Sequence, residues 1–145
     1  MPLTKVVRYG CNAIPQPELV NLYYCKIGRR TKIAAFVEIG KDVVIGEDCK
    51  IEAFSFIPIG VEIGNNVFVG PHVCFTNDKH PPSLDKFVPL KTIVEDGVSI
   101  GARAVILPGI TLHKNCVIGA GSVVTKDVEE GVTVFGNPAG EYENK

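Results

Sequence analysis

Apolar side chains recur at every sixth position along most of this chain. One series runs from Ile27 to Phe75, and a second series, shifted by one residue, runs from Val94 to Val124. The positions are Ile27, Ile33, Ile39, Ile45, Ile51, Ile57, Ile63, Val69, Phe75, Val94, Ile100, Ile106, Leu112, Ile118 and Val124. A fixed period that is sustained in this way indicates an internal structural repeat.

A second set of uncharged positions precedes the first by two residues. It runs from Cys25 to Val73 and again from Thr92 to Ser122, and most of its members are small or β-branched. Residues two apart in a strand share one face of the sheet. Each repeat is therefore predicted to be a very short strand that has two inward side chains and one outward side chain between them.

Glycine often follows the apolar position, where it suits a corner with unusual backbone angles or close packing. It does so at Gly28, Gly40, Gly46, Gly64, Gly70, Gly101 and Gly119. Three strands and three corners make a coil of 18 residues, and one coil cannot bury its own apolar face. Stacked coils, spaced about 4.8 Å apart, therefore predict an all-β triangular prism of parallel strands with about five coils.

The repeat divides the chain into four segments. Residues 1–24 lie off the period and are expected to form an N-terminal cap, because an open end of the stack needs a cover. Residues 25–139 form the β-helix domain, which is interrupted by a loop at 76–93, and residues 140–145 form a polar tail. Long loops in compact repeats usually carry function, so we expect the site at this loop.

Composition excludes several classes of function. The chain is 46% apolar and 21% charged with a net charge of −1, which gives no argument for a nucleic-acid partner. It has no run of 18 apolar residues and no apolar core of a secretory signal, so neither membrane spanning nor secretion is expected. The cysteines are odd in number and form no CxxC pair, which predicts reduced thiols in a cytoplasmic protein without a disulfide framework or zinc knuckle; they are Cys11, Cys25, Cys49, Cys74 and Cys116.

The form [LIV]-G-x-x-x-x, as in Ile39-Gly40, resembles the left-handed parallel β-helix acyltransferases over about residues 25–139. The run Ile118 to Asp127, followed by Gly136-Asn137-Pro138-Ala139, resembles the coenzyme A-binding end of hexapeptide acetyltransferases. The left hand of the helix is implied by this resemblance alone. The resemblance also implies acetyl-coenzyme A as co-substrate, no metal, and a homotrimer with sites between neighbouring prisms.

The resemblance implies a set of coenzyme-binding residues, namely Gly101, Ala102, Gly119, Ala120, Lys126, Asn137 and Pro138. The two Gly-Ala pairs lie 18 residues apart, so they share one corner of successive coils, where small residues leave the backbone open to a pantetheine arm. Lys126 is expected to meet a coenzyme phosphate as a point charge. Asn137-Pro138 is expected to form a rigid turn against the adenine.

The run Phe75 to Lys79 with Pro81 resembles sugar N-acetyltransferases that act on the 3-amino group of a nucleotide-linked deoxysugar. Members of that family more often carry an aromatic residue at position 80 and arginine at position 82. The implied acceptor is a dTDP- or UDP-linked amino sugar whose amine attacks the thioester directly. Catalytic roles are assigned to Asn77, Asp78 and His72, and substrate binding to His80, Lys79 and Phe75. Asn77 and Asp78 would hold the amine and aim its lone pair, and His72 would act as base or sugar ligand.

Three other functions remain open. An O-acetyltransferase of serine or sugar type needs a firm histidine base. A γ-class carbonic anhydrase uses the same prism and three histidines, and this chain has His72, His80 and His113, although no two are five residues apart as that family requires. A β-helix scaffold has no catalysis at all. In addition, Asn77-Asp78 has a purely structural interpretation as an Asx turn that launches the loop.

Overall fold

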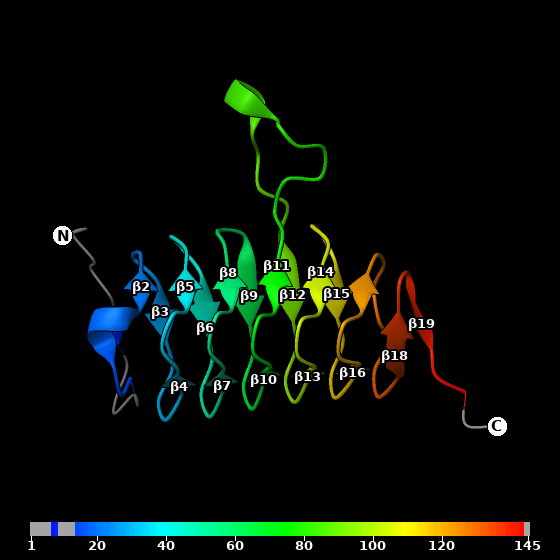
Figure 1. Cartoon of the computed structure of the whole chain (residues 1–145), viewed down its shortest axis with the longest axis horizontal. Helices are drawn as coiled ribbons and strands as arrows, with labels where there is room; N and C mark the ends of the chain where they lie inside the picture. Colours follow the sequence, from blue (N-terminus) through cyan, green and yellow to red (C-terminus); the bar gives the residue numbers. More distant parts are fainter. Residues whose placement is uncertain (1–6, 9–13, 144–145) are drawn as a thin grey trace.

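The computed structural model describes residues 7–8 and 14–143 and shows a left-handed parallel β-helix (Figure 1). Sheet A contains β1 (Val7–Arg8), β3 (Lys26–Ile27), β6 (Val44–Ile45), β9 (Val61–Ile63), β12 (Thr92–Val94) and β15 (Thr111–Leu112). Sheet B contains β4 (Lys32–Ile33), β7 (Lys50–Ile51), β10 (Phe68–Val69), β13 (Ser99–Ile100), β16 (Val117–Ile118), β18 (Thr133–Gly136) and β19 (Ala139–Glu141). Sheet C contains β2 (Asn21–Leu22), β5 (Glu38–Ile39), β8 (Phe56–Ile57), β11 (Cys74–Phe75), β14 (Val105–Ile106) and β17 (Val123–Val124).

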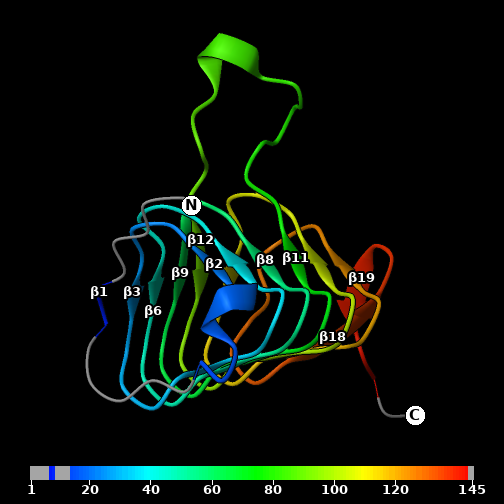
Figure 2. The same cartoon turned by 60° about the vertical axis from the view of Figure 1, so that its left-hand side comes forward.

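The register of the strands shows how the loop fits into the stack. Before the loop, paired residues are one 18-residue coil apart, as in Lys26 with Val44. Across the loop the pairs are Phe68 with Ser99 and Cys74 with Val105, and beyond it the spacing of one coil returns. The extra residues therefore leave the prism entirely, and the coils below and above them stack on each other directly (Figure 2).

The interior of the prism is filled by the two predicted tracks. All the apolar positions from Ile27 to Val124 that recur every sixth residue are buried, and so are the positions two residues before them. Burying an aliphatic side chain of this size contributes about 1.5–3 kcal/mol. The buried hydroxyls have partners: Thr31 donates to the carbonyl of Gly46 at 2.7 Å, and Ser55 contacts the carbonyls of Glu52 and Gly70. The predicted all-β prism with inward pairs of side chains is thus confirmed.

Several predicted boundaries need correction. The sheets contain six or seven strands, so the stack is longer than five coils. Two of these strands, β1 and β2, come from the predicted cap 1–24, the rest of which lies partly outside the described residues. Thr92 and Ile93 belong to β12, so the loop covers residues 76–91. The predicted tail contributes to β19, which pairs antiparallel with β18, and the rings of Phe135 and Tyr142 are in contact.

The prism has three edges, which we name by their content. The loop edge joins sheet C to sheet A and carries the loop. The small-residue edge joins sheet B to sheet C and carries Gly101-Ala102 and Gly119-Ala120. The polar edge joins sheet A to sheet B. The loop extends far from the prism and has a single 3-10 turn, η2 (Leu84–Lys86), near its tip (Figure 1); η1 (Pro17–Leu19) lies at the other end of the chain. The described residues contain no helix with the length and apolarity that a membrane crossing requires.

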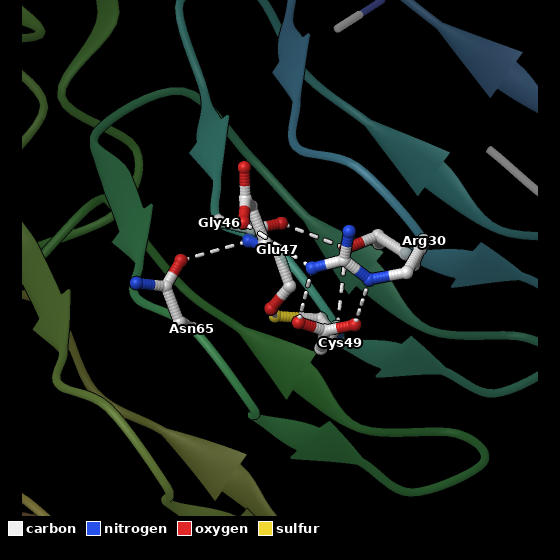
Figure 3. A network of polar contacts seen from close by, with 7 residues as sticks. Arg30, Gly46, Glu47, Cys49 and Asn65 are labelled. Atoms are coloured by element: carbon white, nitrogen blue, oxygen red, sulfur yellow. Dashed lines mark hydrogen bonds and ion pairs between the residues drawn. The ribbon is translucent and has the colours of Figure 1, made fainter. Parts of the chain in front are cut away.

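The polar edge is held by side chains that bond to neighbouring coils (Figure 3). The guanidinium of Arg30 binds both carboxylate oxygens of Asp48, at 2.6 and 2.8 Å, and this hydrogen bonding lowers the pKa of Asp48. The side-chain oxygen of Asn65 accepts a hydrogen bond from the backbone N–H of Glu47 at 2.8 Å. These polar groups of the edge therefore bond to neighbouring coils of the same chain.

Candidate functional site

The glycines of the small-residue edge are required by the stacking of coils. A Cβ added to Gly101 would lie 2.5 Å from the backbone nitrogen of Ala120, and one added to Gly70 would lie 2.7 Å from that of Ala102. A Cβ at Gly119 would lie 2.6 Å from the Cβ of Phe135. These directions point along the stack into the next coil. Close approach between coils therefore explains the glycines without any ligand.

Ala102 and Ala120 carry the small side chains of this edge. Ala102 accepts a hydrogen bond from the N–H of Gly121 at 2.8 Å. The N–H groups of Ala102 and Ala120 donate to no acceptor within residues 14–143. The turn at Asn137-Pro138 continues the same edge, because the N–H of Gly136 beside it donates to the Ser122 hydroxyl at 3.1 Å. The structure thus brings six of the seven predicted coenzyme-binding residues to one edge.

Lys126 does not join them. It lies between β17 and Val128, which forms an isolated bridge with Leu112 of β15, so it is on the loop edge. It borders a hollow that also has Glu129 and Glu141 in its wall. Within one chain it is therefore separated from Ala102 and Ala120 by the width of sheet C. The cation on the small-residue edge is Arg103, which sequence analysis missed.

Arg103 occupies the same corner position as His72 in the coil below, since its N–H donates to the carbonyl of Pro71 at 2.9 Å. Its side chain is exposed and forms no ion pair with any described residue. In the coil above, the corresponding residue is Gly121, and no atom lies within 4 Å of an added Cβ there. The space above Arg103 is therefore open. The sequence could have identified Arg103, because it aligns with His72 one coil below once the residues of the loop are left out of the count.

His72 stands in a stack of rings on the small-residue edge. Its imidazole lies 4.7 Å from the ring of Phe54, nearly parallel to it, and Phe54 lies 5.0 Å from Phe36 in the same way. All three residues have a positive φ near 60°, which turns their side chains outward at successive corners. His72 lies before β11, whereas Asn77 and Asp78 follow it. The structure does not bring these three predicted catalytic residues together within one chain.

Asn77 is anchored at the root of the loop. Its side-chain nitrogen donates to the carbonyl of Ile59 in the coil below at 3.0 Å. No described residue donates to its side-chain oxygen. The amide is therefore held in place by one end and keeps one acceptor available at the other.

Asp78 accepts three hydrogen bonds from the loop. They come from the N–H of His80 at 3.2 Å, the N–H of Ser83 at 2.9 Å and the Ser83 hydroxyl at 2.5 Å. The bond from Ser83 is the main cause that lowers the pKa of Asp78 below its ordinary value. The hydrogen bond from the N–H of His80 to Asp78 forms the Asx turn that the sequence predicted at the start of the loop. A carboxylate stabilised in this way is a weak proton acceptor and a firm hydrogen-bond acceptor.

A cleft of about 310 Å³ opens at the root of the loop. Its walls come from the loop, through Thr76, Asp78, Lys79 and Pro81, and from the next two coils, through Leu107, Pro108 and Thr125. A second hollow of about 250 Å³ lies within the loop and includes Lys79 and His80, which are both exposed. The predicted substrate contact of Phe75 is wrong, because its side chain is fully buried in the core.

Other reactive groups do not form sites. His72, His80 and His113 lie on or beyond three different edges, and His113 pairs with Glu95 at 3.4 Å on the polar edge. Residues 7–8 and 14–143 contain no group of three ligands that could hold a metal ion. Cys49, Cys74 and Cys116 are free thiols, and burial raises the pKa of Cys116 to about 11. Cys11 lies outside the described residues.

Two family models match this chain. "Bacterial transferase hexapeptide (six repeats)" matches residues 24–59 and 42–77, and "Hexapeptide repeat of succinyl-transferase" matches residues 91–126. The break between the matches falls at the loop. The models therefore recognise the coils that the six-residue period predicts.

Two curated relatives and one solved structure are similar to this chain. The chain is 42% identical over 81 residues to a galactoside O-acetyltransferase of Lactococcus lactis, covering 52% of this chain and 39% of the relative. It is 42% identical over 76 residues to 2,3,4,5-tetrahydropyridine-2,6-dicarboxylate N-acetyltransferase of Staphylococcus aureus, covering 52% of this chain and 30% of the relative. The chain thus spans less than half the length of either relative.

The solved structure is that of a mutant of AntD, an N-acyltransferase from Bacillus cereus, in complex with dTDP-4-amino-4,6-dideoxyglucose and coenzyme A. It matches with a TM-score of 0.76 and 20% identity over 94% of this chain and 82% of that one. At this identity the likeness concerns the fold.

Proposed function

Because the chain belongs to the hexapeptide-repeat family of transferases, we propose that it transfers the acetyl group of acetyl-coenzyme A to the amine of a nucleotide-linked amino sugar. The Asn77–Asp78 pair carries this proposal. Asp78 lines the cleft at the loop root, and the side chain of the preceding residue, Asn77, is fixed on the carbonyl of Ile59. The run Phe75 to Lys79 supports the acceptor class. The ligands bound to AntD add support.

The chemistry requires a neutral amine aimed at the thioester carbonyl. The free oxygen of Asn77 and the carboxylate of Asp78 accept hydrogen bonds from the amine and orient its lone pair. The nitrogen–carbon bond forms, and the carbon–sulfur bond of the thioester then breaks. The amine proton leaves with the thiolate. The lowered pKa of Asp78 favours this positioning role over general-base catalysis.

The small-residue edge is the proposed coenzyme groove. The N–H groups of Ala102 and Ala120 supply donors for the pantetheine amides, with Gly101 beneath Ala120, Gly119 beneath Phe135 and Asn137-Pro138 at the end of the edge. Arg103 replaces Lys126 as the residue that meets a coenzyme phosphate, because it lies on the small-residue edge and its guanidinium has no ion-pair partner among the described residues.

A homotrimer would complete the site. The small-residue edge and the loop edge lie at opposite ends of β11, so one chain separates the proposed coenzyme and acceptor sites. Between neighbouring prisms, the small-residue edge of one chain would face the loop edge of the next. Outward apolar side chains on the flat faces support burial by another copy, and they include Val44, Phe56, Phe68 and Val117.

The decisive experiment is a panel of dTDP- and UDP-linked 3- and 4-amino sugars with acetyl-coenzyme A, followed by release of free thiol. We expect turnover of at least one sugar. Asn77→Ala should reduce kcat/KM by about 100-fold, and a melting curve of the variant would show whether loss of the Ile59 contact also loosens the coil. Turnover of serine or a free sugar, with none of the linked amino sugars, would contradict the proposal.

The second candidate is O-acetylation, which the galactoside O-acetyltransferase of Lactococcus lactis favours. A hydroxyl needs a base, and the available histidines near β11 and the loop are His72 and His80. Replacement of both by asparagine should leave an N-acetyltransferase largely active. It should abolish O-acetylation.

A further inference from the structure

The hollow inside the loop has the properties of an oxyanion site. Its volume is about 250 Å³, and it is bounded by Lys79, His80 and Lys86, with Val88 and Leu90 on its apolar side. Two lysines and a histidine thus line one hollow, and neither lysine has an ion-pair partner in the part of the chain that the structure describes.

The carboxylate of Asp78, in the same hollow, already accepts hydrogen bonds from the loop itself. Asp78 accepts hydrogen bonds from the backbone and hydroxyl of Ser83 and from the backbone of His80. These bonds close the turn that gives the loop its shape, so Asp78 organises the hollow and does not neutralise the two lysines by direct contact. An added anion would find the ammonium groups available.

The loop hollow adjoins the cleft at the loop root, and the two share Asp78 and Lys79. The cleft has Thr76 and Thr125 as neutral polar groups and Leu107 and Pro108 as apolar wall. A ligand that fills both hollows therefore has a neutral polar ring joined directly to an anionic group. A sugar linked to a diphosphate has this arrangement.

We propose that the loop hollow binds the diphosphate of the nucleotide-linked acceptor through Lys79, His80 and Lys86, and that the sugar lies in the adjoining cleft. This inference rests on the proposed function for the identity of the acceptor. It adds Lys86 to the binding residues. It also places the linkage between sugar and phosphate next to Asp78 and Lys79, the two residues that both hollows share.

The test measures binding by calorimetry for dTDP, UDP and GDP and for the corresponding nucleosides. Lys79→Met and Lys86→Met should each weaken the tightest nucleoside diphosphate by about tenfold, which is the usual loss for one charge-assisted contact. The matched control is Lys91→Met. Lys91 is a lysine at the end of the loop that pairs with Glu62 at 2.9 Å and lies outside the hollow. It should leave the affinity unchanged, and the nucleosides should respond to none of the variants.

Coenzyme A also contains a diphosphate, so it is titrated into the same variants. Its affinity should not change in Lys79→Met or Lys86→Met. Loss of coenzyme affinity in place of nucleotide affinity would overturn the inference. So would equal effects of all three lysine variants, or no binding of any nucleoside diphosphate to the unmodified protein.

Turnover with the sugar panel separates this inference from the proposed function. Acetylation of a linked amino sugar with an unchanged KM in both variants would retain the proposed function and exclude the diphosphate site. Lysine-dependent binding of a nucleoside diphosphate, without acetylation of any linked amino sugar, would retain the diphosphate site and exclude the proposed function.

Discussion

The small-residue edge and the loop edge lie at the two ends of the same strands of sheet C, yet they are built in different ways. On the small-residue edge each coil repeats the one below it, and the next coil lies so close that only glycine fits at position 101. On the loop edge the chain leaves the stack, and Asp78 and Ser83 replace the contacts between coils by local hydrogen bonds. Substitutions in the stack should thus lower the stability of the fold, whereas substitutions in the loop should change function without unfolding the protein.

The largest effect is expected in the interior of the stack. Ile100 is fully buried between the coils, and Ile100→Ala should lower the free energy of unfolding by about 2–5 kcal/mol. Urea denaturation measures this change. Ser99→Ala, which alters the neighbouring outward residue, should change it by less than about 0.5 kcal/mol. A small effect at Ile100 would mean that the stack tolerates cavities.

The next effect concerns the glycines of the small-residue edge. Gly101→Ala places a methyl group against the backbone of Ala120 and should destabilise the fold by about 1–3 kcal/mol. Gly140→Ala is the control, since no atom lies within 4 Å of its added Cβ. If Gly101→Ala left stability intact and weakened only coenzyme binding, the glycine would serve the ligand and our account of the edge would be wrong.

Arg103→Gln should act on the coenzyme without affecting the stack. We expect the KM for acetyl-coenzyme A to rise about tenfold, equivalent to about 1.4 kcal/mol. Acetyl-pantetheine lacks the phosphates, so its KM should be the same for the variant and the unmodified enzyme. Lys126→Gln provides the comparison. A higher KM in that variant alone would restore Lys126 to the role that the sequence predicted.

The smallest effect is expected at the loop turn. Ser83→Ala removes the main contact that lowers the pKa of Asp78, so this pKa should rise toward its ordinary value of 3.8. Because the pKa is lowered in the folded protein, the stabilisation from ionised Asp78 is present above pH 3.8 and is lost as the pH falls through the lowered value. Carbon NMR of the carboxyl group follows the titration. The KM for the acceptor should rise only a few-fold.

Ser83→Thr keeps the hydroxyl and should restore the titration of Asp78. If Ser83→Ala left that titration unchanged, the turn would depend on the backbone contacts alone. The free energy of unfolding near pH 7 should hardly differ among these variants, because the loop lies outside the core.

The six-residue period was sufficient to predict the prism, its buried positions and the excursion of the chain after Phe75. Each of these depends on local alternation, which assigns a side chain to the inside or outside of a coil whatever its distant neighbours are. The same alternation already placed Phe75 on the inward track, and its burial excludes the substrate contact that was assigned by resemblance. The shared corner of Ala102 and Ala120 also followed, because both lie in coils of uniform length.

Other features depend on contacts between residues that are distant in sequence, and only the folded chain decides them. Closure of each coil assigns a residue to an edge, which places Lys126 on the loop edge, away from Ala102. Arg103, the sequence neighbour of Ala102, is left as the cation of the small-residue edge. The excursion of the loop changes the spacing between coils, so Arg103 and His72 align only after the extra residues are excluded. The partners of Asp78 depend on how the loop folds back onto it. The sequence could therefore place Asp78 at the start of the loop but could not identify the groups that bind its carboxylate.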